Sequence, residues 1–190
     1  MCDIGCGYGG LTKVVSEYLQ AQEVYGIDID EERLQVVSQR GIKVFRVDIE
    51  YEKLPFPDEY FDLVTSFGVL EHLKHFDNFF TESYRVLRKG GFLIISMPNL
   101  GSWINRIALL LGFQPRDVEV SCRVRNQGFL PIYSEGYIGH VHSATLRAMR
   151  KILEFYNFQV VKVQGSSPYM ETKRLGILLK MLDKIFSNEP

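Results

Sequence analysis

Short apolar runs alternate with amphipathic segments along most of this 190-residue chain, and this alternation constrains the fold more than any other feature. Runs such as 42–47 and 61–67 have the length and composition of buried strands, whereas the segments between the runs place apolar residues at helical spacing. Strands that alternate with helices in this way build βαβ units. The chain is therefore expected to form an α/β fold, in which a mostly parallel sheet has helices on both faces in three layers.

The same periodicity places the individual elements. Gly90 and Gly91 are expected to stop a helix that passes through Phe80, and Pro98 is expected to end the strand before it. In the segment after Gly10, one apolar helical stripe is formed by Leu11, Val14, Val15, Tyr18 and Leu19. The predicted strands are 23–27, 42–47, 61–67, 92–97 and 158–163, and further helices begin near Glu31, Phe76 and Ser143.

The length and composition indicate one domain over 1–190, because 46% hydrophobic side chains suffice for one well-buried core. Only Met1 and Cys2 precede Asp3, so the start of the first strand is expected to be missing. The alternation lapses at 99–142, which is interpreted as an insertion. An amphipathic helix is expected at 173–187.

Charge and cysteine content narrow the class of protein. The formal net charge of −1 supplies no basic field, so no nucleic acid partner is expected. The three cysteines form no CxxC pair and suggest no disulfide framework, which fits a reducing cytoplasm. No apolar run approaches the roughly 18 to 20 residues of a bilayer span, so no stable membrane insertion is expected. The oligomeric state stays open.

Glycines are concentrated between the first strand and the first helix, in the segment DIGCGYG. They allow a tight turn and leave bare backbone for a nucleotide-like ligand at a helix N-terminus. Gly5, Gly7 and Gly10 also satisfy the dinucleotide pattern GxGxxG, with Asp28 23 residues after Gly5. A carboxylate at the mouth of the loop, that of Asp3, favours a cationic amino-acid or sulfonium ligand over a pyrophosphate.

From Asp3 to about Val163 the chain resembles the class I S-adenosylmethionine-dependent methyltransferase superfamily. The glycine loop matches its first motif, D-x-G-x-G-x-G. Further segments match in the superfamily's order and spacing, at 26–28, 47–49, 54–56, 61–64, 69–72 and 87–91. The resemblance implies a Rossmann-like sheet, the cofactor S-adenosyl-L-methionine and methyltransferase activity. It also implies a seventh, antiparallel strand, which is expected either in abbreviated form at 165–172 or beyond the end of this chain.

The resemblance further implies a set of cofactor-binding residues. Asp28 would bind both ribose hydroxyls, and Asp48 would accept a hydrogen bond from the adenine amino group. Ile29 and Ile49 would sandwich the adenine ring. The whole set is Asp3, Gly5, Cys6, Gly7, Gly9, Asp28, Ile29, Asp48, Ile49 and Phe67, and no metal is expected.

Each of these residues taken alone has an ordinary structural explanation. Asp28 could cap the next helix, and Asp48 could be a turn residue. Cys6 is interpreted as a small filler of the loop, because nothing near it in sequence would activate a thiolate. The motifs in their common order favour the cofactor site over these explanations.

The absence of one motif narrows the class of acceptor molecule. Gly68 and Val69 follow the strand 61–67, where enzymes that act on exocyclic amines of bases have [DNS]-P-P-[YF]. The chain instead resembles the small-molecule branch of the superfamily, sometimes called type 11 domains, so a small, lipid-like or aromatic acceptor is expected. The acceptor site or lid is expected at 99–142. His140 and His142 are the candidate catalytic bases there, with loop or cap roles as the alternative.

Two other functions compete with a methyltransferase. A truncated or degenerate domain of the same fold could serve as a cofactor-binding or protein-interaction module. A dinucleotide oxidoreductase would need a nicotinamide site, and no sequence feature identifies one.

Overall fold

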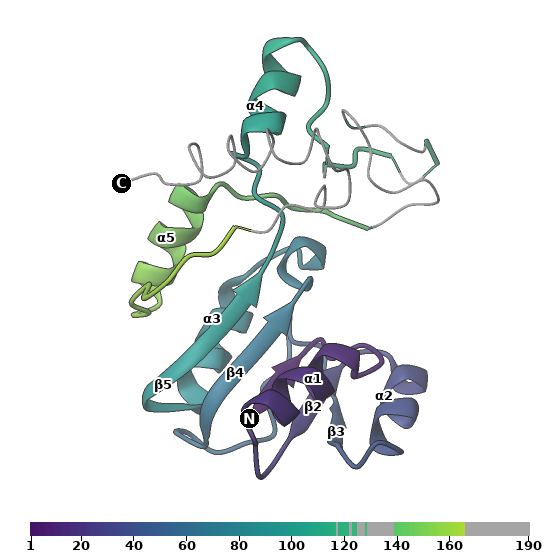
Figure 1. The fold of residues 1–190 in the computed structure, drawn as a ribbon, viewed down its shortest axis with the longest axis vertical. Helices are drawn as coiled ribbons and strands as arrows, with labels where there is room; N and C mark the ends of the chain where they lie inside the picture. Colours follow the sequence, from purple (N-terminus) through teal and green to yellow (C-terminus); the bar gives the residue numbers. More distant parts are fainter. Residues whose placement is uncertain (117, 122, 125–127, 129–138, 166–190) are drawn as a thin grey trace. The chain divides into compact units, whose positions relative to one another are not determined.

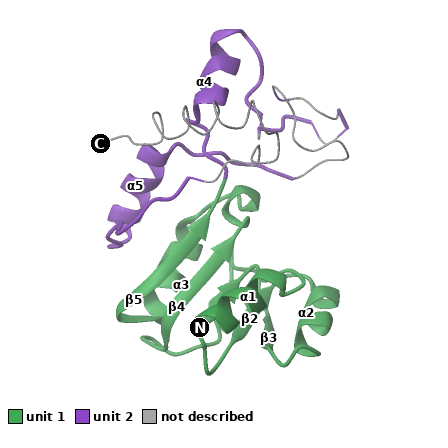
Figure 2. Cartoon of the chain, in the orientation of Figure 1, with its two compact units in different colours: residues 1–97 green, residues 98–190 purple. Residues whose placement is uncertain are grey.

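The computed structural model describes residues 1–116, 118–121, 123–124, 128 and 139–165. The chain divides into two compact units, Met1–Met97 and Pro98–Pro190 (Figure 2). One domain over 1–190 with an insertion at 99–142 stays a prediction. The helix expected at 173–187 lies outside the described residues.

The first unit is built on a five-stranded parallel sheet with strand order β3-β2-β1-β4-β5 (Figure 1). The chain order reverses between β1 and β4, and open parallel sheets bind ligands at such a switch point, beyond the carboxyl ends of the strands. The strands are β1 Cys2–Ile4, β2 Tyr25–Asp28, β3 Lys43–Arg46, β4 Phe61–Phe67 and β5 Leu87–Ser96. The predicted α/β architecture is confirmed, and its parallel sheet brings the glycine loop and the motif segments 26–28 and 47–49 to one edge.

Helices α1 and α3 cover opposite faces of this sheet (Figure 1), and α2 packs on β2 and β3. Asp30 caps α2 by accepting hydrogen bonds from two backbone amides in its first turn. The buried side of α3 presents Phe79, Phe80 and Val86 to the core. The helical bounds are α1 Gly10–Tyr18, α2 Glu31–Ser38, the short 3-10 helix η1 Leu70–His72 and α3 Asp77–Val86.

The expectation that Gly90 and Gly91 end a helix is wrong. The helix α3 already ends at Val86, and Leu87 pairs with Phe61 as the first residue of β5. The pairing register then shifts before Phe92, so the two glycines lie in an irregular part of the strand, where Gly90 has φ +78°. Glycine tolerates this conformation, which is common at β-bulges.

The helix α1 forms where the periodicity places it, but its apolar stripe does not face the sheet. Leu11, Val14 and Tyr18 are exposed, and the one buried residue of α1 is Thr12. The hydroxyl of Thr12 donates to the buried carboxylate of Asp3, and this contact defines the side of α1 that faces β1.

The second unit contains two described helices, α4 Trp103–Leu110 and α5 Leu146–Phe155. The helix expected from about Ser143 is thus present, and Thr145 caps it through the amide of Ala148. The strand expected at 158–163 is wrong: these described residues form no strand, and Val161 is exposed. None of the helices in the described part of the chain has the length and apolar character needed to cross a bilayer.

Candidate functional site

The backbone of the glycine loop between β1 and α1 is left-handed at three glycines. Gly5, Gly7 and Gly9 have φ values of +74°, +54° and +72°. This is the left-handed region, which glycine enters without the steric cost that other residues meet there. This loop conformation therefore favours glycine at three alternate positions, which explains the sequence pattern G-x-G-x-G.

The loop is packed at one end and open in its middle. A Cβ atom on Gly5 would lie 2.2 Å from Cγ2 of Val69, so the loop lies tightly against the segment after β4. A Cβ atom on Gly7 would meet nothing within 4 Å. Bare backbone is thus available to a ligand at Gly7, whereas at Gly5 it serves internal packing.

Backbone amides of the loop donate within the protein. The amides of Gly5 and Cys6 donate to the carbonyl of Ile27, at 2.7 and 2.9 Å. The amide of Gly7 donates to Oδ2 of Asp28 at 2.8 Å, and that of Gly9 donates to the carbonyl of Cys6 at 2.8 Å. A pyrophosphate at a glycine loop depends on such amides pointing at it. The internal bonding therefore disfavours the dinucleotide interpretation.

Asp28 joins the loop to the next strand. It is the last residue of β2 and is 6% exposed. Its Oδ1 accepts from the amide of Asp30 at 3.0 Å, while Oδ2 accepts from Gly7. Each carboxylate oxygen has capacity for a second hydrogen bond. The carboxylate is thus held rigidly beside the open part of the loop, and the next helix is capped by Asp30 instead.

Asp3 lies beneath the loop, which corrects the expectation that it stands at the loop's mouth. It is 2% exposed, and its carboxylate accepts from Thr12 Oγ1 at 2.5 Å and from Thr65 Oγ1 at 2.7 Å. Burial raises the pKa of Asp3 above its ordinary value, although the two hydroxyls oppose the shift. The sequence analysis identified neither threonine as a partner of Asp3. Thr65 lies 62 residues from Asp3, so no local pattern links the two.

The thiol of Cys6 is part of the core. It packs with Leu34, Val37 and Ile42, and a Cβ atom on Gly26 would lie 2.9 Å from Sγ. Desolvation and the charges of two nearby aspartates raise the pKa of Cys6 to about 12. The thiol is therefore neutral, as the interpretation of Cys6 as a filler expects, and only its backbone lies in the loop.

Asp48 begins a closed turn just after β3. Its Oδ1 accepts from the amide of Glu50 at 3.0 Å, and its own amide donates to Glu52 Oε2 at 2.7 Å. Ile49 is 7% exposed, whereas Ile29, which follows Asp28, is 54% exposed. Phe67 ends β4 and is half-buried. The exposed side chain of Ile29 and the carboxylates of Asp28 and Asp48 thus lie at the carboxyl ends of β2 and β3, which are neighbours in the sheet.

Residues 2–95 match a family described as "Methyltransferase domain". This part of the chain belongs to that family. The methyltransferase domain therefore contains all ten residues expected at the cofactor site.

Curated relatives match the same part of the chain. A "Probable S-adenosylmethionine-dependent methyltransferase" of Mycolicibacterium smegmatis is 38% identical over 100 residues, which are 51% of this chain and 37% of that protein. The ubiquinone/menaquinone biosynthesis C-methyltransferase of Burkholderia mallei is 37% identical over 98 residues, covering 49% and 40%. The chain thus spans 40% or less of the length of these relatives.

Solved structures share the fold. An S-adenosylmethionine-dependent methyltransferase from Mesorhizobium loti has a TM-score of 0.65 at 21% identity, with 96% of this chain and 83% of that chain covered. One from Archaeoglobus fulgidus has a TM-score of 0.60 at 18% identity, covering 97% and 77%. At these identities the likeness establishes the fold alone.

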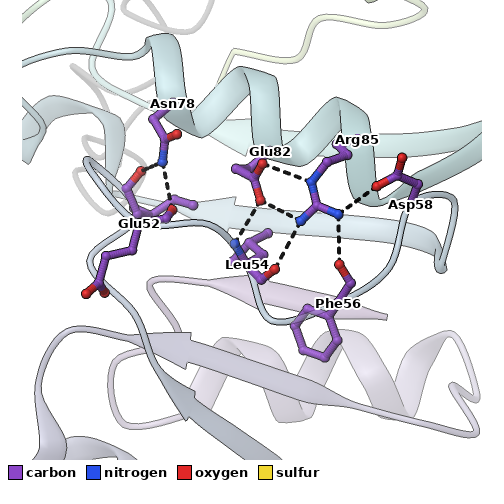
Figure 3. A network of polar contacts seen from close by, with 8 residues as sticks. Glu52, Leu54, Phe56, Asp58, Asn78, Glu82 and Arg85 are labelled. Carbon is purple, nitrogen blue, oxygen red and sulfur yellow. Dashed lines mark hydrogen bonds and ion pairs between the residues drawn. The ribbon is translucent and has the colours of Figure 1, made fainter.

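Helix α3 of the methyltransferase domain holds the loop between β3 and β4 (Figure 3). Glu82 accepts from the amide of Leu54 at 2.8 Å, and Arg85 donates to the carbonyls of Leu54 and Phe56. Desolvation alone would raise the pKa of Glu82, but hydrogen bonds from Arg85 and Leu54 outweigh it and hold the pKa below its usual range. The sequence offered no sign that these polar residues hold the loop.

The candidate bases lie outside the methyltransferase domain that the comparison covers. His140 is buried in the second unit, and its amide donates to Oε2 of Glu119 at 3.3 Å. His142 is exposed. Both residues belong to a different unit from the glycine loop, and a catalytic role for either stays a prediction.

Proposed function

We propose that the protein is a methyltransferase that binds S-adenosyl-L-methionine across the carboxyl ends of β1, β2 and β3. One observation supports this most directly: the loop amide of Gly7 donates to the carboxylate of Asp28, beside backbone that is open to a ligand. This environment is rich in negative charge and has its amides engaged. It suits a ligand with cationic sulfonium and ammonium groups better than one with a pyrophosphate.

In this proposal each strand end serves one part of the cofactor. The amino-acid part lies along the loop at Gly7, above the buried charge of Asp3. The remaining acceptor capacity of Asp28 receives the ribose hydroxyls. Ile29 and Ile49 flank the adenine ring, and Asp48 accepts from its amino group.

Methyl transfer from a sulfonium requires little acid–base catalysis by the protein. The acceptor nucleophile forms a bond to the methyl carbon while the carbon–sulfur bond breaks, and the bonding electron pair stays on sulfur as S-adenosylhomocysteine leaves. The sulfonium is already activated, so the protein contributes mainly by holding the reactants in line, an effect worth up to about 7–11 kcal/mol. A hydroxyl acceptor also needs a base, for which His140 or His142 is proposed.

The acceptor is proposed to be a small molecule. Support comes from the C-methyltransferase of quinone biosynthesis in Burkholderia mallei, which matches about half of this chain. A screen of metabolite extracts with methyl-labelled cofactor identifies the acceptor, since the label must appear in a small product. Label found only in protein or nucleic acid would contradict the proposed acceptor class.

Asp28→Asn tests the cofactor site, because it removes the carboxylate charge and preserves the shape. Calorimetry should show that the unaltered chain binds S-adenosylhomocysteine and not NAD, and that the variant loses at least about tenfold in affinity. Asp62→Asn is the matched control, because Asp62 is exposed and pairs with Arg88 away from the loop. Unchanged affinity in Asp28→Asn would show that the site is misassigned.

A further inference from the structure

We infer that Asn78 on α3 is a positioning residue for recognition of the adenine amino group, acting through the turn that Asp48 begins. The inference rests on the proposed function, because it assumes that adenine binds at Asp48. Neither the motifs nor the family's pattern of site residues pointed to Asn78.

Asn78 holds the turn at two points (Figure 3). Its side-chain Nδ2 donates to the carbonyl of Ile49 and to the carbonyl of Glu52, both at 2.8 Å. The two carbonyls lie three residues apart and bracket the turn. One amide group thus sets both the distance and the direction of the turn relative to α3.

The turn itself is closed by its own hydrogen bonds. The carbonyl of Asp48 accepts from the amides of Tyr51 and Glu52, at 3.0 and 2.7 Å. Oδ1 of Asp48 accepts from Glu50, so an adenine amine would be accepted at Oδ2. Because these bonds tie the turn together, it can move as one piece, and Asn78 holds that piece against the body of the protein.

Helix α3 is a firm support for this contact. Phe79 and Phe80, which directly follow Asn78, are fully buried. Further along the helix, Glu82 and Arg85 hold the next part of the same loop at Leu54 and Phe56. The position of Asn78 is therefore set by core packing, and its contacts to Ile49 and Glu52 support the turn after Asp48. The turn is held at its start by the amide of Val47, which donates to the carbonyl of Asp28 at 3.1 Å.

A small displacement of the turn should affect one part of the ligand only. The hydrogen bond between Oδ2 of Asp48 and the amine depends on the direction of the carboxylate. The ribose and amino-acid contacts come from β2 and the glycine loop, which Asn78 does not touch. Loss of Asn78 should therefore reduce discrimination between adenine and other bases more than it reduces overall affinity.

The test compares two ligands that differ only in the base, S-adenosylhomocysteine and S-inosylhomocysteine, by calorimetry. Inosine replaces the amine with a carbonyl oxygen, which faces the Asp48 carboxylate unfavourably. The unaltered chain should prefer the adenosyl ligand by about 10- to 100-fold, the value of a hydrogen bond to a charged group. In Asn78→Asp, which replaces the donor with an acceptor of nearly the same shape, this preference should fall by about tenfold.

Asn78→Ala provides a second variant that adds no charge and favours the helix. It should also reduce the preference for S-adenosylhomocysteine over S-inosylhomocysteine, but by a smaller factor than Asn78→Asp does. Asp58→Ala is the matched control, because it removes an exposed contact to Arg85 at the far end of the loop, and the preference should persist. A preference unchanged in both Asn78 variants would overturn the inference, as would equal weakening of both ligands. An unaltered chain that binds neither ligand would instead refute the proposed function.

Discussion

Gly5 and Gly7 share a left-handed backbone but differ in their surroundings, and the difference predicts two substitution effects. Gly5→Ala adds a Cβ atom 2.2 Å from Val69, whereas Gly7→Ala adds one with nothing within 4 Å. The first should cost more than about 3 kcal/mol of unfolding free energy through overpacking and strain. The second should cost only about 1–2 kcal/mol through its backbone conformation. Urea unfolding measures both values.

The pair of variants also separates packing from binding. Gly5→Ala combined with Val69→Ala should recover part of the lost stability, because the clashing Cγ2 atom is gone. Gly7→Ala should fold but bind S-adenosylhomocysteine weakly, since its methyl group would occupy space proposed for the ligand. Equal stability losses in the two single variants would contradict this account of the loop.

Asp3 predicts a pH dependence of stability with a definite sign. Its folded-state pKa is raised, chiefly by desolvation, whereas the unfolded chain has a value of about 3.9. The folded state thus binds the proton of the Asp3 carboxyl more tightly than the unfolded chain does. The contribution of Asp3 to the unfolding free energy is therefore fully present below about pH 3.9, the pKa in the unfolded chain, and is lost as the pH rises through the folded-state pKa.

Unfolding free energies measured from about pH 4 upward should therefore fall in the unaltered chain relative to Asp3→Asn. The variant lacks the titrating group and so lacks this component of the profile. Profiles that run parallel over the whole range would show that Asp3 is not perturbed by its burial between Thr12 and Thr65.

At the scale of elements, the support that α3 gives the loop depends on the planar fork of Arg85. Its NH2 group donates to Glu82 at 2.6 Å and to the carbonyl of Leu54 at 3.0 Å, while NH1 donates to the carbonyl of Phe56 at 2.8 Å. A lysine retains the charge but cannot direct donors to all three partners. Arg85→Lys should therefore cost about 2 kcal/mol of unfolding free energy.

The two acidic partners of Arg85 supply the control. The Glu82 side chain is 2% exposed, whereas that of Asp58 is 76% exposed. Exposed ion pairs contribute about 1 kcal/mol or less, so Asp58→Ala should change stability little. If Asp58→Ala proved as costly as Arg85→Lys, the exposed ion pair and not the backbone contacts would hold the loop.

Element boundaries show where sequence periodicity was reliable. It placed α1, α2, β3, β4 and α5 well, because each has a repeat that matches its geometry. It misplaced the junction of α3 and β5, because the glycines at 90–91 resemble a helix end but lie within a strand whose register shifts. It also misjudged the buried side of α1, where Thr12, bonded to Asp3, is buried and the apolar stripe is largely exposed.

At the largest scale, the parallel sheet explains why motifs that are dispersed in the sequence lie at one edge of the fold. The order β3-β2-β1-β4-β5 brings the ends of β1, β2 and β3 to one edge, with the switch point between β1 and β4 beside them. Asp28 lies 21 residues from Gly7 in the sequence but is hydrogen-bonded to it. The motif order predicted this neighbourhood, since parallel strands place their carboxyl ends together.

The α/β class, the glycine loop and the residues at the strand ends could be predicted from the amino-acid sequence, because these depend on local periodicity and on backbone conformations that only glycine adopts easily. The place of Asp3 beneath the loop, its pairing with Thr65 and the contact of Asn78 with the Asp48 turn became visible only in the folded chain. Those contacts join residues 26 to 62 positions apart, or reverse what a local pattern suggests. The physical reason is that a buried polar group takes whichever partner packing brings within reach, and no spacing along the chain encodes that choice.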